Sequence, residues 1–173
     1  MSVLHRILRT LDRVHPARIA HAHCDIPCGI YDPHHAQLAA HTVIRMIDLL
    51  GQLEHPGPDS PLEKKKEFHG KIARYTATKE QHAELAKHEV RILWGDYFKP
   101  EHVQAHPELH DAVWKVMKLG SKGRQEFARK EAEELLEAVN KVAEIFWKTK
   151  NVPTVRVKPP YNTNAETVVP KYA

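Results

Sequence analysis

Apolar residues recur at helical spacing through most of the chain, and four such stretches predict four helices. The expected helices span residues 32–53, 60–97, 107–119 and 123–148. Asp32-Pro33 and Ser60-Pro61 each place a capping side chain before a proline at the first helical position, which is typical of a helix start. The second helix is expected to bend near Gly70 or Thr76, and Gly120 is expected to close the third.

The order and spacing of these helices predict the fold class. The connections are short and no useful stretch alternates apolar and polar residues as a strand does, so we expect an all-α, antiparallel four-helix bundle. Residues 1–15 form a further amphipathic stretch that ends before Pro16. Residues 151–173 carry four prolines and no apolar period, which predicts an irregular or disordered tail. The expected domains are a leader at 1–22, the bundle at 23–150 and the tail at 151–173.

Composition and charge narrow the class of partner. The chain has 173 residues, 42% of them hydrophobic, which suits one ordinary core. It holds no apolar stretch near the roughly 20 residues of a membrane-spanning helix, so no membrane partner is expected. Its net charge of +4 comes from the two ends, since residues 23–150 carry one more acidic than basic side chain. This distribution argues against a nucleic-acid partner.

The leader carries arginines opposite its apolar positions but lacks the continuous apolar core of a secretory signal. Ala20-His21-Ala22 is similar to a small-residue cleavage site, yet export is not supported without that core. An organelle transit peptide stays open as an alternative, because the leader is rich in arginine and nearly free of acidic residues.

Both cysteines of the chain lie in one short segment, His23-Cys24-Asp25-Ile26-Pro27-Cys28-Gly29-Ile30-Tyr31-Asp32-Pro33. Two thiolates four residues apart, beside an imidazole, can surround one metal ion, and thiolates alone suit zinc, copper(I) or nickel. A cut between Ala22 and His23 would add a free amine and an amide nitrogen. Two nitrogens and two thiolates make a planar set that favours Ni(II) or Cu(II) over zinc, with the His23 imidazole as axial ligand. A local disulfide or two buried thiols are the rival interpretations.

The same segment resembles the nickel-binding hook of the nickel superoxide dismutase family. Three later stretches resemble that family too: residues 93–100 (Leu-Trp-Gly-Asp-Tyr-Phe-Lys-Pro), 107–110 (Pro-Glu-Leu-His) and 145–150 (Ile-Phe-Trp-Lys-Thr-Lys). The resemblance implies an enzyme that converts superoxide to oxygen and hydrogen peroxide by Ni(II)/Ni(III) cycling. It also implies a nickel ion, a protease that removes the leader, and a homohexamer. Because it implies that protease, we expect the protein to be processed in the cytoplasm.

The resemblance assigns roles to individual residues. His23 is expected to bind nickel through its amine and imidazole, Cys24 through its thiolate and backbone nitrogen, and Cys28 through its thiolate. Asp25 and Pro27 are expected to shape the loop, with a cis bond before Pro27. Tyr31 and Tyr97 are expected near the nickel, where they would hydrogen-bond an anion or water and restrict access.

Two positions depart from the family pattern. An acidic residue and an arginine that hold the axial imidazole are replaced here by Ala39 and His82. Either His82 or His41 is a candidate substitute. Two other classes of protein stay open on sequence alone. One is a module that binds or delivers nickel, copper or zinc without turnover, and the other is a helical interaction protein whose cysteines sense redox state.

Overall fold

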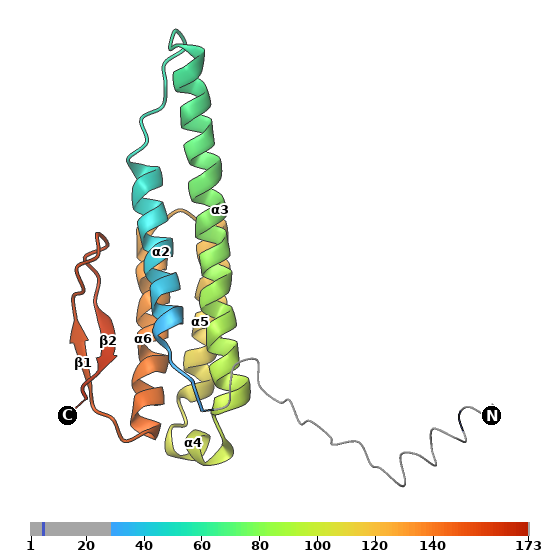
Figure 1. Ribbon diagram of the computed structural model, residues 1–173, viewed down its shortest axis with the longest axis vertical. Coiled ribbons are helices and arrows are strands. Elements are labelled where there is room, and N and C mark those ends of the chain that lie inside the picture. Colours follow the sequence, from blue (N-terminus) through green and yellow to red (C-terminus); the bar gives the residue numbers. More distant parts are fainter. Residues whose placement is uncertain (1–4, 6–28, 173) are drawn as a thin grey trace.

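Four long helices packed side by side and antiparallel form the body of the protein, which confirms the all-α bundle (Figure 1). The structure is a computed structural model that describes residue 5 and residues 29–172. The long helices are α2 (His34–Gly51), α3 (Leu62–Ile92), α5 (Leu109–Gln125) and α6 (Arg129–Thr149). The helix α4 (Pro100–Ala105) joins α3 to α5 across the lower end of the bundle in Figure 1. None of the helices in the described part is long and apolar enough to cross a membrane.

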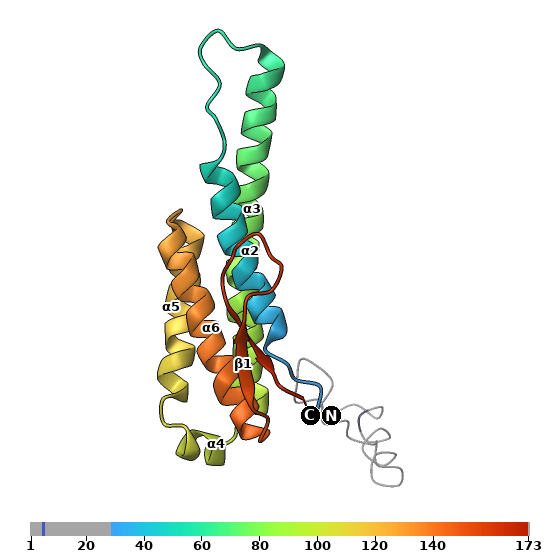
Figure 2. The same ribbon diagram turned by 90° about the vertical axis from the view of Figure 1, so that its left-hand side faces the viewer.

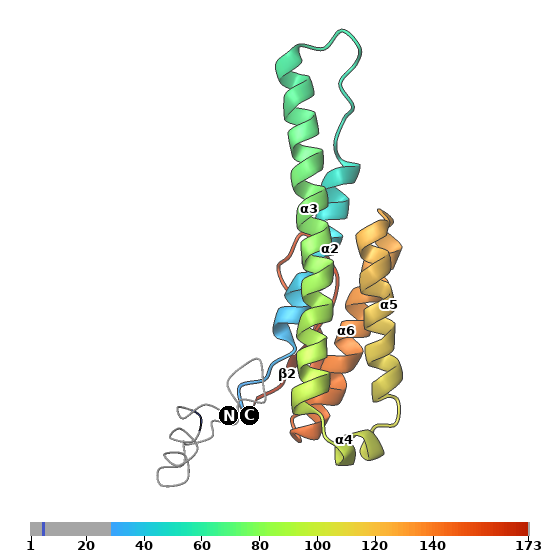
Figure 3. The ribbon, with the colours of Figure 1, turned by 90° about the vertical axis from the view of Figure 1, so that its right-hand side faces the viewer.

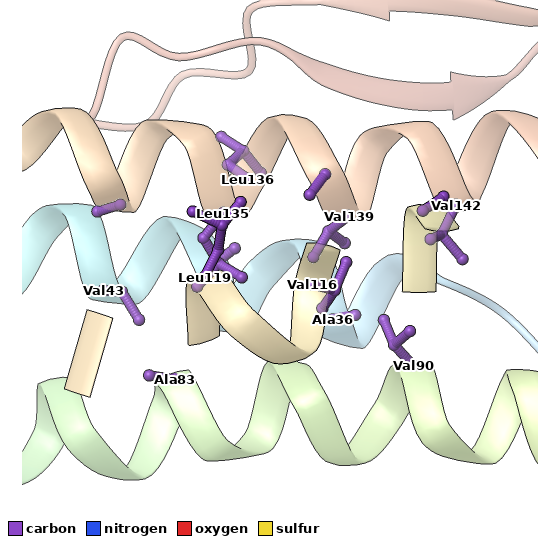
Figure 4. Close-up of a cluster of buried hydrophobic side chains, with 14 of the residues drawn as sticks. Ala36, Val43, Ala83, Val90, Val116, Leu119, Leu135, Leu136, Val139 and Val142 are labelled. Atoms are coloured by element: carbon purple, nitrogen blue, oxygen red, sulfur yellow. The ribbon is translucent and has the colours of Figure 1, made fainter. Parts of the chain in front are cut away.

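The core lies between the four long helices, each of which contributes small or branched apolar side chains (Figure 4). The labelled side chains come from α2, α3, α5 and α6 and point toward one another. Ala36, Val43, Val90, Val116 and Val139 are fully buried. Burial of each such valine supplies about 1.5–3 kcal/mol, so packing of the amphipathic faces accounts for most of the bundle's stability.

The boundary between the third and fourth predicted helices was placed wrongly. Gly120 does not close a helix, because α5 continues through it and through Gly123 to Gln125. A Cβ atom at Gly120 would stand 2.5 Å from Cγ of Lys87 and 3.3 Å from the carbonyl oxygen of Ala83. Glycine therefore allows the close approach of α5 to α3 here. The helix ends later, and residues 126–128 connect α5 to α6.

A buried lysine supports the end of α5. Lys79 of α3 is fully buried, and its Nζ donates hydrogen bonds to the backbone carbonyl oxygens of Gly123, Arg124 and Glu126 at 2.7, 2.8 and 2.9 Å. Its Nζ also lies 4.4 Å from the centre of the Phe127 ring. The last carbonyls of a helix lack partners within the helix, so this ammonium group satisfies them and joins α3 to the α5–α6 connection.

The helix α3 passes through Gly70 and Thr76 without a break, so the expected bend does not interrupt it. It extends beyond the other helices at the upper end of the molecule (Figure 3). At its other end the helix widens into a π-helical turn, η1 (Leu93–Tyr97). The backbone N–H of Phe98 donates to the carbonyl oxygen of Leu93 at 3.0 Å, which closes the wider turn.

The C-terminal segment differs from the irregular tail that its prolines predicted. It forms a two-stranded antiparallel sheet of β1 (Thr154–Val157) and β2 (Thr167–Pro170), which lies along α6 (Figure 2). Pro153 precedes β1, and Pro159 and Pro160 lie in the connection, so these three prolines flank the strands. Pro170 is the last residue of β2, where it is paired with Thr154 at the end of the ladder. Each strand has four residues, which is too short for a recognisable apolar period.

Polar side chains on α2 and α6 fasten this C-terminal hairpin to the bundle. Nε2 of Gln37 donates to the carbonyl oxygen of Val168 at 2.8 Å and to Oδ1 of Asn140 at 3.0 Å. The same Oδ1 accepts the backbone N–H of Val168 at 3.2 Å, and Nδ2 of Asn140 donates to the carbonyl oxygen of Glu166 at 2.9 Å. The outer edge of β2 is therefore paired with side chains of the bundle at Val168.

Candidate metal centre

The residues expected to hold the metal lie just before the described part of the chain. His23, Cys24, Asp25, Pro27 and Cys28 all fall outside the described residues. The cis bond expected before Pro27 also falls outside them. The description resumes at residue 29, so the structure defines the point at which the hook joins the bundle.

The chain enters the bundle through a tight turn. Gly29 has a φ of +92°, a left-handed conformation that residues with a Cβ atom rarely adopt. Ile30 is exposed, whereas Tyr31 is only 8% exposed. Oδ1 of Asp32 then accepts the backbone N–H of His34 at 2.7 Å and supports the first turn of α2. Among the described residues that follow Cys28, Tyr31 is therefore the first with a buried side chain.

The structure brings Tyr31 and Tyr97 together, although 65 residues separate them in the sequence. Their ring centroids are 5.5 Å apart, and the rings are tilted by 52°. Both belong to a cluster at the end of the bundle where α2 begins and where α3 and α6 end, at the bottom of Figure 1. The buried members of that cluster are Tyr31, Ile92, Leu93, Phe146 and Trp147.

The π-helical turn η1 determines how Tyr97 meets this cluster. An inserted residue in a helix shifts every later side chain around the axis by about 100°, since an α-helix has 3.6 residues per turn. Tyr97 is the last residue of η1, and Phe98 after it is extended, with a ψ of 136°. Pro100 then starts α4. The local sequence thus ends a long helix in a widened turn at a residue expected to act near the metal.

Three neighbours fix the plane of the Tyr97 ring. Phe146 lies with its centroid 4.7 Å away, and His102 stacks nearly parallel at 5.5 Å. Nδ1 of His102 accepts the backbone N–H of Lys99 at 3.2 Å, which holds the imidazole in place. Nζ of Lys150 lies 5.1 Å from the centroid of Tyr97 and brings a positive charge to the ring.

The hydroxyl of Tyr97 has a defined partner. It lies 2.7 Å from Oγ1 of Thr149, and the hydroxyl of Thr149 donates to the carbonyl oxygen of Phe146, also at 2.7 Å. Sequence reasoning gave Thr149 and Lys150 no role at the site. The signal that could have found them was their position in the stretch 145–150, which the family resemblance already included.

The two candidate substitutes for the axial support differ in their free nitrogens. His41 is buried, and its Nδ1 and Nε2 pair with the hydroxyls of Thr163 and Thr167 at 2.9 and 2.5 Å. His82 uses Nδ1 to donate to the carbonyl oxygen of Thr78 at 2.8 Å, one turn earlier in its own helix. Both ring nitrogens of His41 therefore form hydrogen bonds. Among the described residues, His82 forms one such bond, through Nδ1.

The bundle does not bring His82, one of the two candidate substitutes, to the tyrosine pair. His82 lies fifteen residues before Tyr97 on the same helical run, which is roughly 20 Å along the axis. Ala39 is only 1% exposed, so this position faces the protein interior. Within residues 29–172 no group of three or more His, Cys, Asp or Glu side chains is arranged to hold a metal ion.

Comparison with known proteins identifies relatives of the whole bundle. The family model for nickel-containing superoxide dismutase matches residues 18–150. The nickel superoxide dismutase of Streptomyces coelicolor is 39% identical over 129 residues, which cover 75% of this chain and 88% of that protein. The one from Streptomyces seoulensis is 36% identical over 129 residues, with the same coverage.

Solved structures agree with these relatives. A native nickel superoxide dismutase shares 38% identity at a TM-score of 0.61, covering 74% of this chain and 99% of that chain. A structure with nickel ligation of the oxidized state shares 34% identity at a TM-score of 0.64, covering 75% of this chain and 99% of that chain. Since nearly all of those chains are matched and the family match ends at residue 150, the C-terminal hairpin is an addition to the matched region.

Proposed function

Because the chain belongs to the nickel-containing superoxide dismutase family and is an oxidoreductase that uses nickel, we propose that residues 23–28 bind the nickel ion once residues 1–22 have been removed. The observation that carries the proposal is the segment from His23 to Pro33, whose buried Tyr31 packs against Tyr97. The function is disproportionation of superoxide.

The donor atoms of the hook fit nickel. Removal of the leader turns the backbone nitrogen of His23 into a free amine, whose ordinary pKa is about 7.7–8.0 and which would bind the metal after releasing its proton to water. That amine, the backbone nitrogen of Cys24 and the thiolates of Cys24 and Cys28 supply two nitrogens and two sulfurs. Such a set would suit Ni(II), and the His23 imidazole would be a further ligand.

Nickel held in this way supplies the Ni(II)/Ni(III) couple, through which one superoxide is oxidised to oxygen while a second, with two protons, is reduced to hydrogen peroxide. The residues of the chain bind the substrate and exclude competitors. Tyr31 and Tyr97 narrow the approach to the hook. Asp25 and Pro27 shape the loop that carries the ligands.

Positive charge beside the tyrosine pair supports superoxide as the substrate. Lys150 lies over the ring of Tyr97, and Lys99 and Lys148 are exposed on the neighbouring segments. A cation close to a site raises the local concentration of a small anion and its rate of arrival. Mutation of these lysines would therefore change the salt dependence of the reaction more than its chemistry.

We also propose the cellular setting that the family implies. A protease removes the leader 1–22, the domain 23–150 assembles as a homohexamer, and the protein acts in the cytoplasm. In this arrangement the segment 151–173 is a separate addition to the enzyme domain. Gel filtration with light scattering tests the hexamer, and N-terminal sequencing of the protein from its native cells tests the cleavage point.

The amine mechanism is tested by moving the amino terminus by one residue. A chain that begins at His23 and a matched chain that begins at Ala22 have the same thiolates and the same bundle. After nickel loading, we expect superoxide decay and a Ni(III) spin signal only from the chain that begins at His23. Equal activity of the two chains would contradict the role of the amine, and bound nickel without superoxide decay would indicate a delivery module.

A further inference from the structure

Thr149 holds the hydroxyl group that faces Tyr97, and its proton is already committed. Oγ1 of Thr149 donates to the backbone carbonyl oxygen of Phe146 at 2.7 Å. A carbonyl oxygen carries no proton, so the threonine hydroxyl must be the donor in this bond. Threonine has one hydroxyl proton, and its oxygen can therefore only accept in any other hydrogen bond.

The hydrogen bond between Tyr97 and Thr149 then has only one direction. The two hydroxyl oxygens are 2.7 Å apart, and since Thr149 has no second proton, Tyr97 is the donor. The phenol proton of Tyr97 therefore points at Thr149, and the phenol oxygen presents lone pairs in its remaining directions. We infer that Thr149 is a positioning residue that makes Tyr97 a hydrogen-bond acceptor toward the metal hook.

The packing around Tyr97 maintains this direction. Phe146 and His102 contact the ring from two sides, so the phenol plane cannot turn to offer its proton elsewhere. Only rotation of the O–H bond could release the proton, and that rotation gives up the bond to Thr149. Phe146, whose carbonyl oxygen fixes Thr149, is fully buried on the last turns of α6.

The consequence is a preference among ligands at the nickel. This inference rests on the proposed placement of Tyr97 beside the hook. A bare anion can only accept hydrogen bonds, so it gains nothing from a phenol oxygen that also only accepts. Water and hydrogen peroxide carry protons and can donate to it. Tyr97 thus favours water and the product, which carry protons, over anions without a proton. Superoxide is such an anion too, so its approach depends on the positive charge beside the ring and not on a hydrogen bond from Tyr97.

Azide, a small anion with no proton to donate, is the probe for this role. In nickel-loaded protein that begins at His23, the azide dissociation constant is measured by spectrophotometric titration, which does not depend on turnover. The variant Thr149→Val removes the acceptor and frees the phenol proton, so azide is expected to bind about tenfold more tightly, since hydrogen bonds to charged groups have this strength. Thr149→Ser keeps the hydroxyl and is expected to behave as the parent.

The double variant Thr149→Val with Tyr97→Phe identifies the phenol as the source of the gain. It should bind azide no more tightly than Tyr97→Phe alone. An unchanged azide constant in Thr149→Val, or a gain that persists in the double variant, would overturn the role of Thr149. If Tyr97→Phe alone changes neither turnover nor azide binding, the placement of Tyr97 near nickel fails instead. Thermal unfolding of each variant verifies that the bundle is intact.

Discussion

His41 shows how a titratable side chain is kept neutral between the bundle and the C-terminal hairpin. Burial, with a smaller contribution from the charge of His34, lowers the pKa of His41 from its ordinary 6.5 to about 4. Its ring nitrogens pair with the hydroxyls of Thr163 and Thr167, and its ring packs T-shaped against that of Tyr161 at a centroid distance of 5.1 Å. All three partners lie between residue 158 and the end of β2, so the state of His41 depends on the hairpin.

The lowered pKa of His41 predicts a loss of stability in acid. The unfolded chain takes up a proton at His41 below about pH 6.5, whereas the folded protein does so only below about pH 4. The contribution of His41 is therefore complete above pH 6.5 and falls as the pH drops to 4, by up to about 3 kcal/mol. Urea unfolding measured across this range should show the decline.

A matched pair of variants assigns that decline. His41→Gln keeps a side chain that donates and accepts hydrogen bonds but does not titrate, so the unfolding free energy should depend less on pH between 6.5 and 4. His88→Gln removes an exposed histidine of α3 and should keep the slope of the parent. Equal slopes for the parent and His41→Gln would mean that His41 is not the group responsible.

At the scale of the elements, close contact between helices decided where the sequence prediction failed. Gly120 is surrounded by α3, since the side chain of Lys87 and the backbone oxygen of Ala83 occupy the space that a methyl group would need. Nζ of Lys87 is itself held by Glu84 and Ser121 at 3.2 Å each, so the side chain cannot move without losing those bonds. At Gly70 of α3, in contrast, a methyl group would have nothing within 4 Å.

The two glycines predict opposite effects of the same substitution. Gly70→Ala should stabilise the protein by up to about 1 kcal/mol, because alanine is the better helix former and meets no neighbour. Gly120→Ala should destabilise it by roughly 1 kcal/mol or more, because overpacking outweighs the gain in helix propensity. Denaturant unfolding at neutral pH measures both. A stabilised Gly120→Ala variant would show that α3 and α5 can separate at little cost.

Features carried by consecutive residues could be predicted from the sequence, and features made by distant contacts could not. The spacing of apolar residues and the prolines near two helix starts predicted the bundle. The segment that begins at His23 predicted the family. The bond from Tyr97 to Thr149 joins positions 52 residues apart that no local pattern connects. The hairpin was missed because its strands are short and are held by side chains of α2 and α6.

At the scale of the whole molecule, the protein combines a bundle shared with its relatives and a C-terminal hairpin that follows the matched region. Further contacts hold the hairpin besides the Gln37–Asn140 network and the bonds of His41. The guanidinium of Arg156 on β1 pairs with Glu137 and Glu144 of α6, at 2.7 and 2.9 Å. The ring of Tyr172 meets Trp147 edge to face, with centroids 6.1 Å apart.

Removal of residues 151–173 should leave a folded bundle with an altered His41. Without Thr163, Thr167 and Tyr161, the imidazole would face water, and its pKa should rise from about 4 toward the ordinary 6.5. Titration of the histidine ring signals by NMR, in the full chain and in a chain that ends at Lys150, measures this change. A His41 pKa that stays near 4 in the shortened chain would show that the helices alone bury it.

The way the hairpin is attached has a consequence for how it can come away. Its anchors on the helices include an amide, an imidazole and a second amide, from Gln37, His41 and Asn140. Water can form hydrogen bonds with all three groups. Separating the hairpin from them therefore costs much less free energy than exposing an apolar surface of equal size would. The apolar surface that detachment would expose is therefore small on these three groups and lies instead at Val168 and at the contact of Tyr172 with Trp147.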